Sequence, residues 1–343
     1  MNFVGSHILS IDQFALADVV TVFRTADELE PYARRRRSTR VLEGAILGNL
    51  FFEPSTRSRF SFGAAFERLG GSVREMTGFE YTSFAKGESI FDTARVMSGY
   101  VDALVVRHPE VGKVREFADA THVPVINSGD GTGEHPTQAL LDLYTIEKEL
   151  GVRISDLRGL KLAMVGDLRH GRTVHSLTKI VSLLADVDFR FVAPEALQMP
   201  GDIANAATSA GHRVLRTESL AEGVRDADVV YCTRLQEERF ATRAEADRYR
   251  GMYSLNRASL ETMCKRGVTL LHPLPRDSRV GNMELDSDLD DHPSLAVFRQ
   301  ADNGIAVRMA LFALVLGVAE RVHETVRDVS WYVPRQYGVR DRK

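Results

Sequence analysis

Hydroxyl and guanidinium side chains follow one another in Ser55-Thr56-Arg57-Ser58-Arg59, between a short apolar run at 45–52 and a helical pattern at 60–69. A loop between a buried strand and the start of a helix presents free backbone N–H groups and the positive end of the helix dipole, which favour a bound anion. The segment lacks the glycine spacing and the lysine of a Walker loop. An N-cap serine beside a surface arginine is the ordinary interpretation of Ser-Thr-Arg, but the longer string at 51–62 favours a phosphate site.

A histidine precedes a second predicted helix, which runs from Pro136 to about Leu150 with proline in its first turn. The helix dipole disfavours a protonated imidazole there, so we expect His135 to stay neutral and to donate a hydrogen bond to a carbonyl. Gln138 lies about one turn further on and presents its amide to the same space. An isolated histidine is usually structural, but a glycine-rich loop and a helix start together favour a function.

The segment 166–173 reads Gly-Asp-Leu-Arg-His-Gly-Arg-Thr and joins a strand to a helix, which suggests a dinucleotide site. The G-x-G-x-x-G spacing is absent, and the following strand ends without the acidic residue that would bind a ribose. We therefore interpret Arg172, at the start of the helix, as a ligand for an anion.

Two further segments follow predicted strands of the second half. Arg234 and Gln236 come directly after the strand at 229–232 and suit an amino-acid carboxylate, although a charged loop is an equal reading of this segment alone. Pro273 and Leu274 follow the strand at 268–271, within His-Pro-Leu-Pro-Arg. Prolines fix an extended backbone and leave carbonyl groups unpaired, and such carbonyls accept hydrogen bonds from an amine or amide.

Strands and helices alternate twice along the chain, with a polar junction at 151–159. This pattern predicts an α/β protein with two doubly wound parallel sheets. We expect one domain over residues 1–150, a second over 151–303, and an apolar helix at about 304–325 that packs back onto the first domain. Ligands of such sheets lie outside the carboxyl ends of the strands, so we expect the active site in the cleft between the domains.

Composition restricts the class of protein. The chain has 343 residues, of which 44% are hydrophobic and 27% charged, so it can fill two cores. The net charge of −3 argues against nucleic-acid binding, and we expect no membrane span, no secretory signal and a cytoplasmic location. Of the 44 basic residues 37 are arginine, the side chain that grips both oxygens of a carboxylate or phosphate. Two cysteines are too few for a disulfide framework.

Together the motifs resemble the aspartate carbamoyltransferase family over about residues 7–325. Phe-x-Glu-Pro-Ser-Thr-Arg is typical of carbamoyltransferases as a whole. His-Pro-Leu-Pro and Thr-Arg-x-Gln-x-Glu-Arg indicate aspartate rather than ornithine as the acceptor. The segment 83–89 resembles a mobile loop that reaches the active site of a neighbouring subunit.

The resemblance implies transfer of a carbamoyl group from carbamoyl phosphate to L-aspartate in pyrimidine biosynthesis, by a homotrimer, with no metal and no cofactor. Carbamoyl phosphate would be held by Ser55, Thr56, Arg57, Ser58, Arg107, His135, Gln138, Pro273 and Leu274. Aspartate would be held by Lys86, Arg172, Arg234 and Gln236. Thr56, Arg57, Lys86, Arg107 and His135 would act in catalysis, with Ser83 and Lys86 donated by the adjacent subunit.

Two departures from the family pattern concern this chain. Ser58 stands where the family usually has threonine, which keeps the hydroxyl, and the loop has Phe84-Ala85 before a single lysine. We expect this loop to be polar, with no apolar stripe that attaches it to its own core. A different amine acceptor, a non-catalytic scaffold subunit and a nicotinamide-dependent oxidoreductase are the alternatives. The sequence leaves open whether regulatory or dihydroorotase-type chains bind, and what the tail at 330–343 does.

Overall fold

The computed structural model describes residues 1–80, 82–279 and 281–333. The chain folds as two compact units, unit 1 with residues 1–141 and 302–343, and unit 2 with residues 142–301. The boundaries fall within helix α5 (Pro136–Leu150) and helix α11 (Val297–Val315). Among the described residues, the helices all fall short of the length and apolarity that a bilayer crossing requires.

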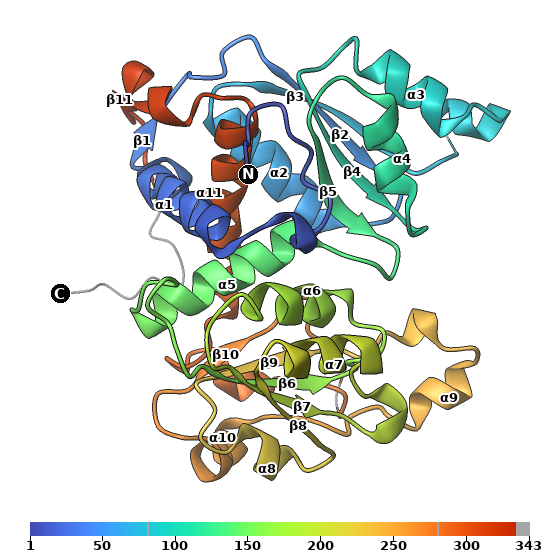
Figure 1. The fold of residues 1–343 in the computed structure, drawn as a ribbon, viewed down its shortest axis with the longest axis vertical. Helices are drawn as coiled ribbons and strands as arrows, with labels where there is room; N and C mark the ends of the chain where they lie inside the picture. Colours follow the sequence, from blue (N-terminus) through green and yellow to red (C-terminus); the bar gives the residue numbers. More distant parts are fainter. Residues whose placement is uncertain (81, 280, 334–343) are drawn as a thin grey trace. The chain divides into compact units, whose positions relative to one another are not determined.

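Unit 1 is built on a parallel sheet with strand order β3-β2-β4-β5, and a short antiparallel pair, β1 with β11, lies apart from it (Figure 1). Its strands are β1 (Arg37–Ser38), β2 (Ile46–Phe51), β3 (Ser72–Thr77), β4 (Ala103–His108), β5 (Val125–Asp130) and β11 (Arg327–Asp328). Its helices besides α5 and α11 are α1 (Leu16–Ala33), α2 (Thr56–Arg68), α3 (Ile90–Met97) and α4 (Lys113–Ala120), with 3-10 turns η1 (Ile11–Gln13), η2 (Ser83–Lys86) and η6 (Ala319–Thr325).

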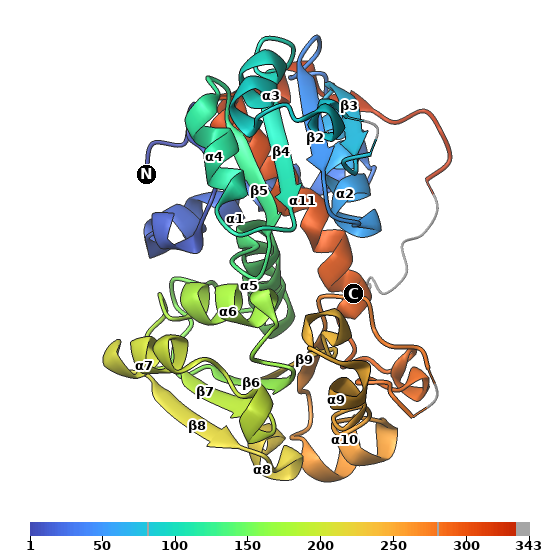
Figure 2. The same cartoon turned by 90° about the vertical axis from the view of Figure 1, so that its right-hand side faces the viewer.

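Helices cover both faces of this sheet (Figure 2). On one face, Leu50 and Leu104 belong to a buried cluster that includes residues of α3 and α4. On the other face, the Asn49 amide donates to the carbonyl of Arg59 in α2. Alternation along each strand therefore gives both faces a helical layer, as a doubly wound sheet requires.

Helix α11 packs onto α2 of unit 1 through aromatic rings. The ring of Phe312 in α11 meets the rings of Phe62 and Phe66 in α2 edge to face, at centroid distances of 6.0 and 5.0 Å. The predicted extent of this helix, about 304–325, is wrong. The helix begins at Val297 and ends at Val315, because Gly317 adopts a positive φ of 68° and residues 319–325 form the 3-10 turn η6.

Unit 2 contains a second parallel sheet, with strand order β10-β9-β6-β7-β8. Its strands are β6 (Lys161–Gly166), β7 (Asp188–Val192), β8 (Arg213–Thr217), β9 (Val229–Thr233) and β10 (Thr269–Leu271). Its helices are α6 (Arg172–Val181), α7 (Gly201–Ser209), α8 (Leu220–Val224), α9 (Arg243–Asp247) and α10 (Arg257–Met263), with 3-10 turns η3 (Glu195–Leu197), η4 (Glu237–Arg239) and η5 (Ser287–Leu289).

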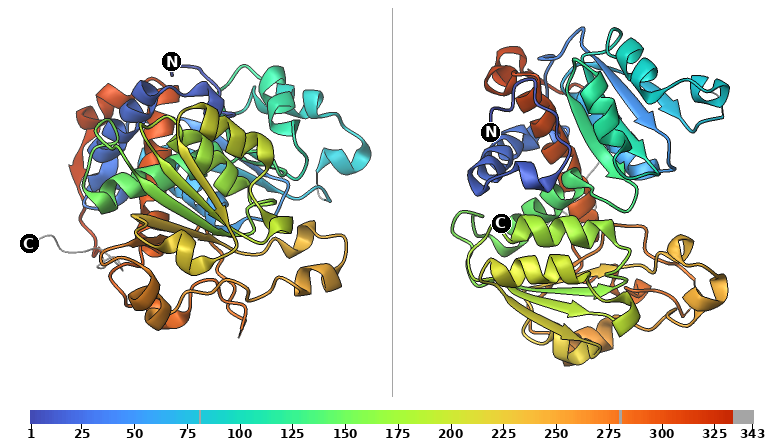
Figure 3. Two further views of the ribbon diagram at one scale, coloured as in Figure 1. Left: turned by 60° about the horizontal axis from the view of Figure 1, so that its bottom comes forward. Right: turned by 45° about the vertical axis from the view of Figure 1, so that its right-hand side comes forward.

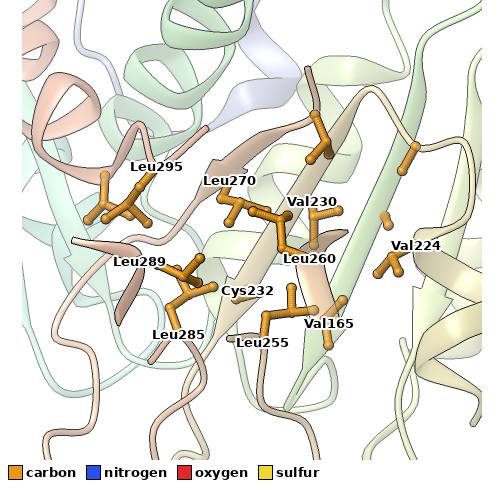
Figure 4. Packing of buried hydrophobic residues seen from close by; sticks show 14 of the residues in the cluster. Val165, Val224, Val230, Cys232, Leu255, Leu260, Leu270, Leu285, Leu289 and Leu295 are labelled. Atoms are coloured by element: carbon orange, nitrogen blue, oxygen red, sulfur yellow. The ribbon is translucent and has the colours of Figure 1, made fainter. Parts of the chain in front are cut away.

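In unit 2, α6 and α7 lie on one face of the sheet and α8 and α10 on the other (Figure 3). Beneath α8 and α10 lies an apolar core, in which Val165, Val230 and Leu270 come from three neighbouring strands (Figure 4). The expected fold class, two doubly wound parallel sheets, is confirmed. Part of the tail for which no role was predicted, residues 334–343, lies outside the described residues.

Candidate active site

In unit 1 the strand order reverses between β2 and β4, which pair although β3 separates them in sequence. Ligands of open α/β sheets bind outside the carboxyl ends of the strands at such a point. The segment 55–58 follows β2, and Arg107 lies at the end of β4 in register with Phe51. The fold thus brings the predicted phosphate segment and Arg107 to one edge of the sheet.

The first turn of α2 is open to an anion. Ser55 is its N-cap, with extended backbone (φ −161°), and its side chain caps no N–H group of the described residues. Thr56 and Arg57 are exposed, whereas Ser58 is 9% exposed. The helix has 13 residues, so its dipole and its first N–H groups favour a negatively charged group at this end.

Arg107 is held against the loop that precedes α2. Its Nη2 lies 2.8 Å from Oε2 of Glu53, and its Nη1 donates to the carbonyl of Ser128 at 3.2 Å. Only 12% of the Arg107 side chain is exposed, so the ion pair is shielded from water. Sequence reasoning assigned no role to Glu53, although it belongs to the motif.

His135 and Gln138 lie at the start of α5, as predicted. The His135 carbonyl accepts hydrogen bonds from Gln138 N at 3.0 Å and Ala139 N at 3.2 Å, and its imidazole is 4% exposed, with Nδ1 3.4 Å from Oγ1 of Thr137. Gly131 N donates to the carbonyl of His108 at the end of β4. The loop that carries His135 therefore passes the same carboxyl edge as Arg107.

The segment with Ser83 and Lys86 forms the turn η2, and both side chains are exposed. The expectation that no apolar group attaches this loop to its own core is wrong. The Phe84 ring packs against Phe52 and Phe79, at centroid distances of 5.2 and 5.9 Å, beside the core of unit 1. Burial of this ring stabilises the turn within its own chain.

In unit 2 the strand order reverses between β6 and β9. Arg172 is the first residue of α6, which follows β6, and Arg234 and Gln236 follow β9. The two strand ends approach closely at Gly166 (φ 118°), where a Cβ atom would lie 2.2 Å from the carbonyl oxygen of Thr233. The three side chains predicted to hold a carboxylate thus belong to one edge of the second sheet.

A buried carboxylate at the end of β6 fixes the loop after β9. Asp167 is 1% exposed, and its Oδ2 accepts a hydrogen bond from Gln236 N at 3.1 Å. Its Oδ1 accepts from His170 N at 3.0 Å. Sequence reasoning missed Asp167 as a positioning group, since its partner lies 69 residues away.

Arg234 forms a bidentate ion pair with Glu238. Nη1 lies 3.0 Å from Oε2, Nη2 bonds Oε1, and Nη1 also donates to the carbonyl of Leu235 at 2.9 Å. Burial alone would lower the pKa of the Arg234 guanidinium, but the hydrogen bond and charge of Glu238 outweigh burial and raise it. Glu238 thus orients the charged group without removing its charge.

Two hydrogen bonds hold the backbone of the segment after β10. His272 N donates to Oε1 of Gln300 at 3.0 Å, and Leu274 N donates to Nδ1 of His272 at 2.9 Å. Burial lowers the pKa of His272, which keeps this acceptor nitrogen unprotonated. Leu274 adopts a φ of 61°, a strained conformation typical of functional sites, and no backbone N–H group of the described residues donates to the carbonyls of Pro273 and Leu274.

An open hollow lies at this edge of unit 2, lined in part by Asp167, Leu235 and Glu237. Within the described ranges, His, Cys, Asp and Glu side chains form no group of three placed to hold a metal ion.

Comparison with known proteins assigns both halves of the chain. Residues 6–148 match the family described as aspartate/ornithine carbamoyltransferase, carbamoyl-P binding domain, and residues 158–315 match the corresponding Asp/Orn binding domain. The aspartate carbamoyltransferase catalytic subunit of Cellvibrio japonicus is 58% identical over 332 residues, which are 97% of this chain and 98% of that protein.

Solved structures agree with the sequence comparison. Aspartate transcarbamoylase of Trypanosoma cruzi in complex with carbamoyl aspartate and phosphate is 38% identical with a TM-score of 0.84, and the match covers 92% of this chain and 97% of that one. The same enzyme in complex with N-(phosphonacetyl)-L-aspartic acid matches with a TM-score of 0.83, 38% identity and the same coverage. This chain belongs to the aspartate/ornithine carbamoyltransferase family.

Proposed function

We propose that this chain transfers the carbamoyl group of carbamoyl phosphate to the α-amino group of L-aspartate, which gives N-carbamoyl-L-aspartate and phosphate. The observation that carries the proposal is a set of anion ligands at the switch point of each sheet, in a chain 58% identical to an aspartate carbamoyltransferase. Carbamoyl phosphate is a dianion and aspartate carries two carboxylates, so both substrates require arginine-rich ligands.

We assign the phosphate group to the start of α2 in unit 1. Its ligands are the hydroxyls of Ser55, Thr56 and Ser58, the Arg57 guanidinium and the first N–H groups of the helix. Arg107, oriented by Glu53, bridges the phosphate and the carbonyl oxygen. These groups supply the positive charge that the leaving phosphate requires.

We assign the carbamoyl group to two polar side chains and two backbone carbonyl groups. His135 and Gln138 contact its carbonyl oxygen and amide, and the carbonyl oxygens of Pro273 and Leu274 accept from its NH₂ group. The absence of backbone donors to these two carbonyls among the described residues supports this role.

We assign aspartate to unit 2, where Arg172, Arg234 and Gln236 bind its carboxylates. Support comes from the fixed geometry of this edge, because Asp167 holds Gln236 and Glu238 holds Arg234. Lys86 completes the ligands, and it neutralises charge on the phosphate.

The neutral α-amino nitrogen of aspartate attacks the carbamoyl carbon, and a new N–C bond forms. Negative charge develops on the carbonyl oxygen, where Thr56, Arg107 and His135 stabilise it. The C–O bond to phosphate then breaks, the phosphate leaves with the electron pair, and a phosphate oxygen takes the proton from the nitrogen. No side chain acts as a nucleophile, so catalysis consists of positioning and electrostatic stabilisation.

We further propose a homotrimer in the cytoplasm that acts in pyrimidine biosynthesis, with Ser83 and Lys86 donated to the adjacent subunit. The likeness to aspartate carbamoyltransferase catalytic subunits supports this assembly. Native mass spectrometry of the purified protein, alone and with proteins that co-purify, measures the number of chains and any regulatory or dihydroorotase-type partner.

Product identification tests the reaction. The chain is incubated with carbamoyl phosphate and, in separate reactions, L-aspartate, L-ornithine or L-glutamate, and the products are separated by mass spectrometry. We expect carbamoyl aspartate together with an equal amount of phosphate. Carbamoyl ornithine as the main product, or hydrolysis of carbamoyl phosphate with every acceptor, would contradict the proposal.

A further inference from the structure

Charged side chains outside the proposed substrate ligands form one ion cluster in unit 2. We call it the Glu237 cluster, and it consists of Glu237, Arg250, Asp277 and Arg279, with Asp247 paired to Arg250 at its margin. Glu237 is its centre: Nε and Nη2 of Arg250 lie 2.9 and 2.8 Å from its two carboxylate oxygens. Nη2 of Arg279 bonds the same carboxylate, and Nε of Arg279 lies 3.0 Å from each carboxylate oxygen of Asp277.

The cluster connects segments that leave neighbouring strands. Glu237 follows Gln236 directly and belongs to the loop after β9. Asp277 and Arg279 belong to the segment after β10, beyond Leu274. Because Arg279 bonds Glu237 as well as Asp277, it ties the proposed aspartate loop to the segment that continues from the His-Pro-Leu-Pro motif.

The cluster is only partly accessible to water. The exposed fraction of the Glu237 side chain is 26%, those of Arg250 and Asp277 are 19% and 14%, and that of Arg279, the most exposed member, is 49%. Hydrogen bonds from Arg250 and then Arg279 lower the pKa of Glu237 to about 2. A carboxylate that bridges two guanidiniums in this setting contributes more than an isolated surface pair.

We propose that the Glu237 cluster is a positioning device for aspartate binding, in which Glu237 holds the loop that carries Arg234 and Gln236. The proposal rests on the function proposed above. Asp167 fixes the start of this loop through Gln236 N, and the cluster fixes the residues that follow. Glu237 is not a substrate ligand, and it acts by positioning the loop that carries Arg234 and Gln236.

Loss of the Glu237 cluster should weaken the binding of aspartate and leave the binding of carbamoyl phosphate unchanged. The backbone at 273–274 has its own support, through His272 and Gln300, which does not involve the cluster. The ligands assigned to phosphate belong to unit 1. Loss of the cluster therefore frees the aspartate loop while the groups assigned to carbamoyl phosphate keep their supports.

The test compares Glu237→Gln, Arg279→Gln and the double variant with wild type. The control is Asp186→Asn, which breaks the exposed Arg213–Asp186 ion pair of the same unit and keeps a residue type that tolerates the φ of 56° at this position. We expect Glu237→Gln to raise the KM for aspartate roughly five- to tenfold, with kcat and the Kd for carbamoyl phosphate changed less than twofold.

The double variant tests whether the bond between Glu237 and Arg279 is responsible for the effect. Because Glu237 and Arg279 share one interaction, the double variant should raise the KM for aspartate less than the product of the two single effects. An aspartate KM within twofold of wild type in Glu237→Gln, or equal effects on both substrates, would overturn the proposal. So would an Asp186→Asn effect as large as that of Glu237→Gln.

Hydrogen–deuterium exchange supplies a readout that is independent of activity. Peptides over 234–240 and 276–279 should exchange faster in Glu237→Gln than in wild type, while peptides of unit 1 keep their rates. Unchanged exchange in both peptides would refute the positioning role. If wild type forms no carbamoyl aspartate, the proposed function fails, and the exchange experiment still decides whether the cluster holds the loop.

Discussion

Replacement of Arg234 by alanine should raise the KM for L-aspartate about 100-fold. The Arg234 guanidinium can donate two hydrogen bonds to one carboxylate, as its bidentate pair with Glu238 shows. A hydrogen bond to a charged group contributes about 1.5–3 kcal/mol. Loss of two such bonds at the lower end costs about 3 kcal/mol, and a factor of ten corresponds to about 1.4 kcal/mol.

Stability should change little in the same variant, because the partner that loses its ion pair, Glu238, is 51% exposed. We expect a loss of under about 1 kcal/mol in the free energy of unfolding, measured by urea denaturation. Steady-state kinetics with each substrate varied in turn should show the KM for carbamoyl phosphate within threefold of wild type. Arg213→Ala, which removes an exposed guanidinium of the same unit, is the matched control.

The role of Arg234 would be disproved if Arg234→Ala weakened the binding of both substrates equally, or if its KM for aspartate stayed within tenfold of wild type. The first result would remove the assignment of aspartate to the edge of the second sheet. The second would mean that Arg234 contributes little to aspartate binding.

Arg57→Ala should weaken carbamoyl phosphate binding by at least tenfold while the KM for aspartate changes far less, and isothermal titration with carbamoyl phosphate checks this. Lys86→Ala and Arg57→Ala should each be nearly inactive as trimers, and joint refolding at equal ratio should restore about one quarter of wild-type activity if Lys86 serves the adjacent chain; no recovery would place Lys86 in its own chain. Burial lowers the pKa of His175, so below its usual value of 6.5 the unfolded chain binds a proton that the folded chain does not, and the free energy of unfolding falls as pH falls. His175→Gln, which keeps a donor for the Leu168 carbonyl 2.7 Å away, should reduce that slope by up to about 1.4 kcal/mol per pH unit in urea denaturation between pH 7 and 5. Carbamoyl transfer should persist in excess EDTA, and loss of activity that zinc restores would contradict the ligand set.

The sequence allowed prediction of β2, β4 to β7, β9 and β10, which include the edge strands β5 and β10, because most of these are apolar runs between polar loops. The edge strands β3 and β8 were not predicted, since all of their residues are exposed or half-exposed and carry no apolar pattern. The end of α11 was misplaced because apolar residues continue past Gly317. Apolar runs in the sequence therefore predicted the strands that are buried on both faces and missed the strands that are partly exposed.

Residues with motif chemistry could be found from sequence, and the residues that orient them could not. Glu53 and Asp167 act through partners that the fold brings together, at separations of up to 69 residues. Glu238 is only four residues from Arg234, and the conformation of their loop decides that the two side chains meet. Phe84 was read as part of a polar loop, because the rings that receive it come from distant segments. Such contacts depend on loop geometry, which local patterns do not encode.

We propose that the anion ligands of unit 1 bind carbamoyl phosphate and that those of unit 2 bind aspartate, the two substrates of one carbamoyl transfer. Titration calorimetry with N-(phosphonacetyl)-L-aspartic acid, which joins a phosphonate and an aspartate in one molecule, tests it directly. We expect one molecule bound per chain in wild type, and affinity reduced at least tenfold by Arg57→Ala and, separately, by Arg234→Ala. Undiminished affinity in either variant would contradict the account.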